Sequence, residues 1–247
     1  MSVRTASEPV REAIIEMREL GGPAGPSAPS GAAPFQGIVV PGKKLLAVHD
    51  PRDPRSETIR TLRAELLLRR ESADGNDVIA LLSACAGEGR SLLAADLAIG
   101  VAQTGCPTLL VDADFRRPQQ HLLFGTHNRL GLAHALASGE PPQLREVRGL
   151  PTLSLLTAGE SPGDPLEALS SLAFKRMVED WRRHFRFVVI DTAPVAEFSD
   201  ALVIANLVGR VLVLSRARHT RYREMQDLLR RLASTRSEVL GAVISHF

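Results

Sequence analysis

Short runs of apolar residues alternate along the chain with longer segments in which apolar residues recur every three or four positions. The runs are typical of strands buried on both faces, and the longer segments of amphipathic helices. The predicted strands are 78–83, 108–112, 153–157, 187–191, 210–215 and 239–245, and the predicted helices are 56–70, 91–104, 174–184, 201–208 and 221–234. Strands that alternate with helices form parallel sheets covered on both faces. The sequence therefore predicts a three-layer α/β domain with a mostly parallel central sheet.

The N-terminal part of the chain departs from this alternation. Residues 8–20 predict a short helix whose apolar side is formed by Ile14, Ile15, Met17 and Leu20. Residues 21–37 are dense in Pro, Gly, Ala and Ser, and such a segment buries too little apolar surface to order itself. We therefore divide the chain into an N-terminal helix with a flexible linker, residues 1–37, and a folded domain, residues 38–247.

Composition limits the classes of protein that fit. The net charge is only +2 over 247 residues, so bulk electrostatics gives no reason to expect a nucleic-acid partner. Two cysteines, Cys85 and Cys106, stand without a Cys/His cluster, which argues against structural zinc or a disulfide framework. No segment approaches the roughly 20 apolar residues of a transmembrane helix, and the N-terminus lacks the apolar core of a secretory signal. We expect a cytoplasmic protein.

A glycine-containing loop follows the first of these predicted strands. Gly87 and Gly89 let backbone N–H groups approach phosphate oxygens with no Cβ in the way, and the helix that follows adds its own free N–H groups. Ser91 falls where the first helical turn can offer a hydroxyl to Mg²⁺. The loop approximates the pattern GxxxxGK[ST], with Ala84 in place of the first Gly and Arg90 in place of Lys. Taken alone, the loop could also be an ordinary Gly-rich turn.

Carboxylates follow two further predicted strands. Asp112 and Asp114 stand at the end of one strand, and Asp191 stands at the end of another. A single Asp after a strand is often only a turn former or a helix cap. Ligands of parallel α/β sheets bind at the carboxyl ends of the strands, where Mg²⁺ takes one or two carboxylates together with phosphate oxygens. The three aspartates and the loop together predict a Mg-nucleotide site.

The segments GEGRS, LLVDADFR and VVIDTAP resemble the Walker A, A′ and B motifs of bacterial tyrosine kinases (BY-kinases). The resemblance covers roughly residues 45–247 and is strongest to the kinases of exopolysaccharide clusters, which act with a membrane chain-length determinant. It implies a P-loop NTPase fold, so that residues 38–247 would form a nucleotide-binding, kinase-like domain. It also implies an ATP-dependent protein tyrosine kinase, of the autokinase type, that regulates exopolysaccharide polymerisation or export.

The resemblance also implies roles for individual residues, with ATP and Mg²⁺ as cofactors. Asp112 or Asp114 would orient or deprotonate the attacking tyrosine, and Arg90 would neutralise phosphate charge. The implied metal-binding residues are Ser91, Asp112 and Asp191. The implied nucleotide-binding residues are Gly87, Glu88, Gly89, Arg90, Ser91 and Leu92.

Partners are implied in the same way. Glu57, Arg60 and Arg63 match the ExxRxxR helix through which members of the family form rings, so a homo-oligomer is expected. An intrahelical ladder of salt bridges would explain the same spacing without a partner. The cytoplasmic tail of the chain-length determinant is the second expected partner, and it would hold this chain at the inner face of the plasma membrane.

Three departures from the family pattern bear on activity. Arg90 replaces the P-loop lysine, and Ser245 stands where relatives often have an asparagine near the base. Family kinases typically phosphorylate a C-terminal tyrosine cluster, whereas this chain has one tyrosine, Tyr222, at the start of a predicted helix. That position favours a surface or packing role over a role as phosphate acceptor.

Two other functions fit the same fold. One is a catalytically weak ATPase or docking module whose nucleotide state controls assembly with the co-polymerase. The other is a partition-type or division-site ATPase. Proteins of that second kind commonly carry an extra lysine early in the phosphate loop, and the segment 83–86 has none.

Overall fold

The computed structural model describes residues 35–68, 76–161 and 163–246. The predicted helix at 8–20 and most of the predicted linker lie outside the described residues. Strand β1, Phe35–Val39, begins three residues before the predicted start of the domain. The last three residues of the predicted linker therefore belong to the sheet.

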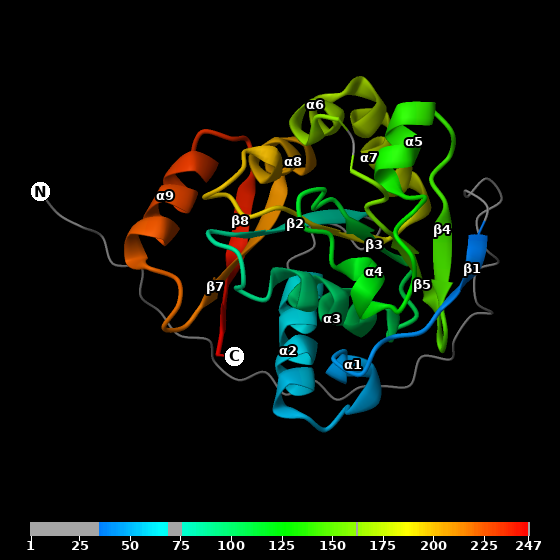
Figure 1. Cartoon of the computed structure of the whole chain (residues 1–247). Helices are drawn as coiled ribbons and strands as arrows, with labels where there is room; N and C mark the ends of the chain where they lie inside the picture. The colour runs from blue at the N-terminus through cyan, green and yellow to red at the C-terminus, as the bar shows by residue number, and fades with distance from the viewer. Residues whose placement is uncertain (1–34, 69–75, 162, 247) are drawn as a thin grey trace, which may run out of the picture.

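One sheet of eight strands organises the described part of the chain, in the order β1-β4-β5-β3-β6-β2-β7-β8 (Figure 1). All neighbouring pairs are parallel except β4 and β5, which are antiparallel. The sheet is thus mostly parallel, as the sequence predicts. After β1, the strands are β2 Asp77–Ser83, β3 Thr108–Asp112, β4 Leu144–Val147, β5 Leu150–Leu156, β6 Phe187–Asp191, β7 Arg210–Arg216 and β8 Glu238–Ser245.

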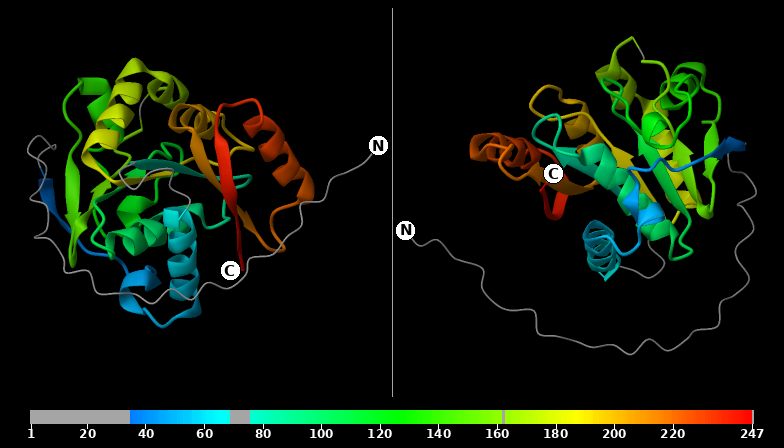
Figure 2. Two further views of the ribbon diagram at one scale, coloured as in Figure 1. Left: turned by 180° about the vertical axis from the view of Figure 1, so that it is seen from behind. Right: turned by 60° about the horizontal axis from the view of Figure 1, so that its bottom comes forward.

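Helices cover both faces of this sheet, and Figure 2 shows the two layers from further directions. Helices α1, α2 and α3 lie on one face, while α5 to α9 pack on the other. The short helix α4 lies close to α3. The bounds are α1 Leu46–His49, α2 Pro54–Leu68, α3 Arg90–Ala102, α4 Gln120–Leu123, α5 Leu132–Ser138, α6 Pro165–Ser170, α7 Leu172–His184, α8 Asp200–Val208 and α9 Tyr222–Leu232.

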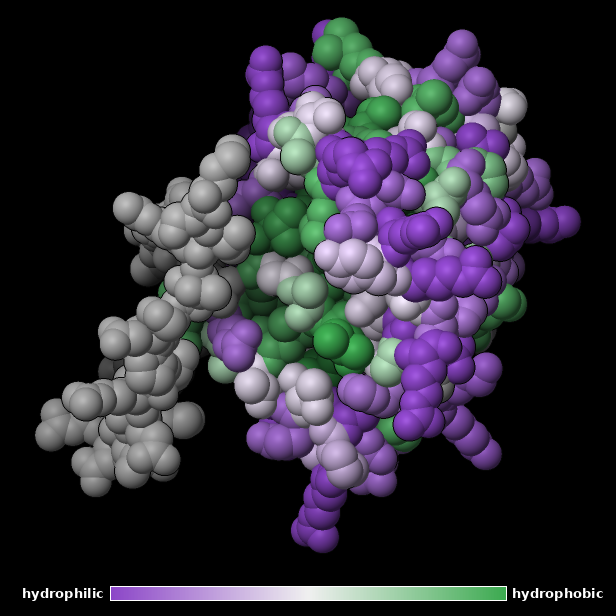
Figure 3. Space-filling model, turned by 90° about the vertical axis from the view of Figure 1, so that its left-hand side faces the viewer, coloured by the Kyte–Doolittle hydropathy of each residue, from purple (hydrophilic) through white to green (hydrophobic). Residues whose placement is uncertain are grey.

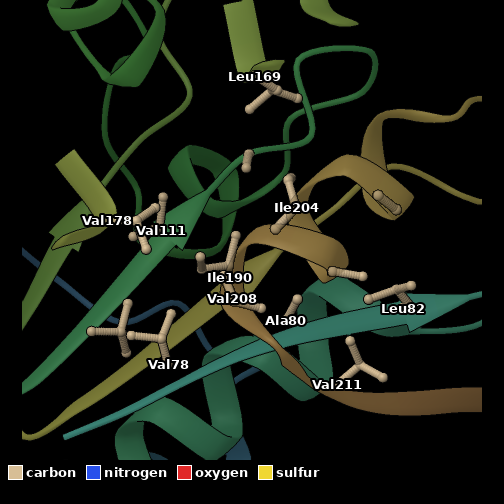
Figure 4. Packing of buried hydrophobic residues seen from close by; sticks show 14 of the residues in the cluster. Val78, Ala80, Leu82, Val111, Leu169, Val178, Ile190, Ile204, Val208 and Val211 are labelled. Carbon is tan, nitrogen blue, oxygen red and sulfur yellow. The ribbon is translucent and has the colours of Figure 1, made fainter. Parts of the chain in front are cut away.

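The central strands bury side chains on both faces. Every residue of β2, β3 and β6 is buried, which explains why these strands read as continuous apolar runs and do not alternate. Figure 4 shows one of the two cores, in which Val78 and Ala80 of β2 and Ile190 of β6 lie near Ile204 and Val208 of α8. Burial on both faces holds the ends of these strands rigidly, and the candidate site is built on those ends.

The six strands and five helices predicted after residue 38 are all present, with bounds that differ by a few residues at most. The prediction missed β1, β4, α1, α4, α5 and α6. The helices among these are seven residues or shorter, too short to display a helical period, and β1 and β4 lack a continuous apolar run. Across the residues that the structure describes, no helix combines the length and the apolar character needed to span a membrane.

Candidate functional site

Asp112 and Asp191 lie side by side. They are the last residues of β3 and β6, and in the parallel ladder between these strands they stand directly opposite each other. Both are fully buried. Parallel strands that end at the same edge bring their terminal side chains together, as the sequence analysis expected. Two carboxylates this close in a water-poor setting call for a compensating cation.

The glycine loop lies beside these carboxylates, between β2 and α3. Gly87 and Gly89 have φ angles of 77° and 91°, in the left-handed region that side chains with a Cβ disfavour. Their conformation turns the loop over the start of α3. A cavity of about 320 Å³ opens there, bordered by residues 86–92 and by Lys44, Asp114 and Arg117. The loop therefore faces an open cavity beside the start of a helix, where an anion is favoured.

Glu88 fixes the shape of the loop from within. Its carboxylate is buried and accepts hydrogen bonds from the backbone N–H of Cys85, at 3.0 Å, and from the hydroxyl of Thr220. Its backbone carbonyl accepts a bond from Ser245 Oγ at 3.0 Å. The loop is thus tied to the segment after β7 and to the end of β8.

Two more side chains brace the loop from the β7 side. Arg216 Nη1 donates to the carbonyl of Gly87 at 3.0 Å, and His219 Nε2 lies 3.2 Å from the carbonyl of Ala86. Sequence analysis gave these residues no role, because their link to the loop depends on β7 lying next to β2 in the sheet. The only available signal was the density of arginines after that strand.

Asp112 is held by backbone donors. Its Oδ2 accepts from the N–H groups of Gln119 and Gln120 at 3.0 and 2.9 Å, and its Oδ1 accepts from the N–H of Asp114 at 3.2 Å. Burial, and then the neighbouring charge of Asp191, raise the pKa of Asp112 well above its usual range. A carboxylate with a raised pKa accepts a proton more readily than an exposed one.

Arg90 is the cation of this cluster. Its Nη2 donates to Asp114 Oδ2 at 3.0 Å, its Nε donates to Asp191 Oδ1 at 3.3 Å, and its Nη1 donates to Ser83 Oγ at 2.5 Å. The side chain is almost fully buried. The planar guanidinium reaches all three groups at once, which a lysine ammonium on its shorter stem would not do with the same geometry. Arg90 thus neutralises carboxylates, in addition to lining the cavity of the loop.

Gln120 is a site residue that sequence analysis missed. The residue is fully buried, and its Nε2 donates to Asp191 Oδ2 at 2.8 Å and to the carbonyl of Ser91 at 2.9 Å. Its Oε1 is buried and has no hydrogen-bond partner. Gln120 lies at the start of α4, a helix of four residues that leaves no periodic signal in the sequence.

The remaining predicted residues, Asp114, Ser91 and Leu92, line the same cavity. Asp114 accepts the N–H groups of Arg116 and Arg117 at 3.1 and 2.9 Å, and burial raises its pKa. Ser91 and Leu92 line the cavity in the first turn of α3. The structure thus brings together all the residues predicted for the site. Within the described ranges, no three His, Cys, Asp or Glu side chains are arranged to hold a metal ion by themselves.

Comparison with known proteins identifies the chain. No family model matches it. The tyrosine-protein kinase YwqD of Bacillus subtilis is 32% identical over 205 residues, which cover 82% of this chain and 86% of YwqD. The crystal structure of the chimerical protein CapA2B2 superposes with a TM-score of 0.78 and 30% identity, over 87% of this chain and 94% of that one. The kinase domain of the Escherichia coli tyrosine kinase ETK gives a TM-score of 0.77 and 28% identity, over 82% and 79% of the two chains.

The fold and the loop define a P-loop NTPase-like domain with a nucleotide-binding architecture. The chain belongs to the bacterial tyrosine kinase family and is a protein-tyrosine kinase. Membership in this family also sets aside the partition-type ATPase.

Proposed function

We propose that this kinase transfers the γ-phosphoryl group of Mg-ATP to tyrosine at the site formed by the glycine loop and the three aspartates. The single observation that carries the proposal is the juxtaposition of Asp112 and Asp191 beside the loop that ends in Ser91. Phosphoryl transfer depends mostly on positioning and on neutralising charge, and this arrangement supports both.

The donor set fits magnesium. The hydroxyl of Ser91 and the carboxylates of Asp112 and Asp191 are hard oxygen donors, and phosphate oxygens in the cavity would complete the coordination. Mg²⁺ seldom uses a cage made of protein ligands alone, so the lack of a group of three or more such side chains among the described residues agrees with this proposal. When bound, the ion would neutralise charge on the β- and γ-phosphates.

The neighbouring groups would bind the phosphates, neutralise charge and accept the tyrosine proton. The backbone N–H groups of residues 87–92 would bind the phosphates, with Glu88 holding the loop in shape. Arg90 would neutralise the anionic cluster. Asp112 or Asp114 would orient the tyrosine hydroxyl and take its proton, since burial raises the pKa of both. Asp114 borders the cavity directly, which supports its contact with an incoming substrate.

We further propose that copies of the chain associate through α2. Glu57 is well exposed on this helix, and it pairs with Arg60 within the helix. Arg63 donates to the carbonyl of Gly100 at 2.9 Å, so it acts inside its own chain. Next to α2, a groove is lined by Ile59, Leu62, Leu93, Val243 and Ile244. Figure 3 faces the side of the molecule that carries α9 and β8 and shows an apolar hollow there, which a second copy would cover.

The pathway and the second partner also belong to this proposal. Resemblance to kinases of exopolysaccharide clusters supports a role in polymer assembly or export. It likewise supports binding to the cytoplasmic tail of a membrane chain-length determinant, which would keep the kinase at the membrane.

Labelled Mg-ATP tests the proposed reaction. The protein would be incubated with a Glu/Tyr copolymer, with and without the cytoplasmic tail of a membrane chain-length determinant. We expect phosphotyrosine on the polymer and its loss in Asp112→Asn. Ser91→Ala and Asp191→Asn should each weaken Mg-ATP binding, whereas Asp227→Asn, an exposed aspartate on α9, should not. Nucleotide binding without transfer would favour the docking module, and unchanged affinity in both site variants would contradict the proposed metal site.

A further inference from the structure

The chain holds a single tyrosine, Tyr222, and its side chain is open to solvent. Tyr222 is the first residue of α9, and 77% of its surface is exposed. Its hydroxyl accepts one hydrogen bond, from Gln226 Nε2 at 2.8 Å. Of the surface or packing role expected from its place in the sequence, the structure confirms the surface position. An exposed phenol on the first turn of a helix is accessible to another protein.

The surroundings of Tyr222 suit a phosphate. The segment from Arg216 to Arg223 reads RARHTRYR and contains four arginines and one histidine, and the carboxylate that follows it, Glu224, accepts the backbone N–H of Arg221 at 2.8 Å. Arginine pairs with phosphate through two parallel hydrogen bonds, and negative charge is favoured at a helix N-terminus. Both features would stabilise a phosphorylated Tyr222.

Tyr222 lies across the glycine loop from the carboxylates of its own site. In the sheet, β2 lies between β6, which ends in Asp191, and β7, which leads into the segment before Tyr222. Thr220 and Arg216 contact the loop from the β7 side, while Asp112 and Asp191 approach it from the β3 and β6 side. The glycine loop therefore stands between Tyr222 and the carboxylates of its own chain, which favours transfer from a second copy.

We infer that Tyr222 is a phosphate acceptor of this kinase, modified by a second copy of the chain. In the reaction, the Tyr222 oxygen bonds to the γ-phosphorus of ATP. The bond from that phosphorus to the bridging oxygen breaks, and ADP leaves with the electron pair. The phenol proton passes to Asp112 or Asp114 of the other copy. This inference rests on the proposed kinase reaction, and it names one substrate of that reaction.

The single tyrosine makes the test direct, because phosphotyrosine on the chain can come from Tyr222 alone. Full-length protein, first treated with a tyrosine phosphatase that is then removed, would be incubated with labelled Mg-ATP. We expect phosphotyrosine in peptide 198–224, which a glutamate-specific protease releases, and loss of self-labelling in Tyr222→Phe. The Tyr222→Phe variant should still phosphorylate a Glu/Tyr copolymer, because Tyr222 forms no part of the proposed site.

A mixing experiment tests transfer between copies. Tyr222→Phe, which lacks the acceptor, would be mixed with size-tagged Asp112→Asn, which lacks activity and keeps Tyr222. Label should appear on the tagged chain, and Asp191→Asn would replace Asp112→Asn if the latter fails to fold by circular dichroism. No label on the tagged chain while wild type labels itself would overturn transfer between copies.

The two proposals fail in different ways. Wild-type protein that phosphorylates the copolymer but acquires no phosphotyrosine of its own would overturn Tyr222 as acceptor and leave the kinase reaction standing. Self-labelling that persists in Tyr222→Phe would place the acceptor on another residue type and also overturn it. Absence of transfer to either substrate would contradict the proposed reaction itself.

Discussion

Arg90 donates from Nε to Asp191 across 3.3 Å inside a buried cluster. The same guanidinium donates to Asp114 at 3.0 Å. Asp112 and Asp191, which are adjacent on the sheet, therefore have a fixed cation beside them in the folded chain. Replacement of the usual P-loop lysine by arginine has a structural consequence, because one planar group compensates Asp191 at the end of β6 and Asp114 just after β3.

Removal of this cation should destabilise the protein strongly. In Arg90→Ala, Asp114 and Asp191 would remain buried without their partner, so the free energy of unfolding should fall by about 3 kcal/mol or more. Urea denaturation at neutral pH measures the change. Arg117→Ala provides the control, because Arg117 forms its ion pair with Glu197 at the surface, where the expected loss is below about 1 kcal/mol. Equal effects of the two substitutions would contradict the central place given to Arg90.

Asp96 should give the stability a measurable pH dependence. It lies on α3, buried and paired with Arg55, and burial outweighs this partner and raises the pKa of Asp96. Above about pH 4, the unfolded chain has released this proton while the folded chain still holds it. The contribution of Asp96 to stability is therefore largest at low pH and falls as the pH rises toward the folded-state pKa.

The variant Asp96→Asn isolates this group, because the other carboxyl groups titrate in both proteins. The free energy of unfolding of wild type, minus that of Asp96→Asn, should decrease from pH 4 upward by at most about 1.4 kcal/mol per pH unit. Urea denaturation at pH 4, 5, 6 and 7 gives the difference. A difference that is flat or that grows with pH would show that the pKa of Asp96 is not raised.

Most of the fold was predictable, because β2, β3 and β6 are buried on both faces and leave continuous apolar runs in the sequence. The juxtaposition of Asp112 and Asp191 followed from the same pattern, since parallel strands end at a common edge. The hydrogen-bond partners of Arg90 could not be predicted from this pattern, because they depend on the order of the strands in the sheet. Sequence proximity places β2 next to β3, yet β6 lies between them.

The roles of Gln120 and Thr220 could not be predicted from the sequence for a related reason. Each acts through one hydrogen bond or two with a residue at least 29 positions away, Ser91 for Gln120 and Glu88 for Thr220. Such contacts carry no periodic signal, and a single Gln or Thr in a polar segment resembles any surface residue. Motifs locate the residues that line the cavity, whereas the residues that hold them in place become visible only in three dimensions.

Cys85 should resist alkylation although it lies in the glycine loop. Burial, followed by a hydrogen bond with Glu224, raises the pKa of its thiol to about 11. Only the thiolate reacts, so near pH 7.5 Cys85 should be modified roughly a hundredfold more slowly than an ordinary exposed thiol. Mass spectrometry of tryptic peptides after timed iodoacetamide treatment measures the rate, which should rise with pH up to about 11. Fast labelling at neutral pH would contradict the raised pKa of this half-buried thiol.

Gln120 should stabilise the site through the two hydrogen bonds that its amide nitrogen donates. In Gln120→Leu, the hydrogen bonds to Asp191 and to the carbonyl of Ser91 are lost, and the free energy of unfolding should fall by about 1–3 kcal/mol. Gln103→Leu is a matched control, because Gln103 also donates one side-chain bond to a backbone carbonyl, that of Ala47 at 2.8 Å, away from the cavity. Urea denaturation of the two variants gives the comparison.

A second measurement tests whether the side-chain oxygen of Gln120 takes part in ligand binding, separately from the contribution of Gln120 to folding. Its Oε1 is buried and unpaired beside Asp191, so it is free to accept a hydrogen bond from a group that binds there. Mg-ADP should therefore raise the melting temperature of Gln120→Leu less than that of wild type, and ADP with a chelator should affect both proteins alike. Gln103→Leu should respond to Mg-ADP as wild type does. If Gln120→Leu kept the full Mg-dependent increase, Gln120 would act in folding alone, and its unpaired oxygen would have no part in binding.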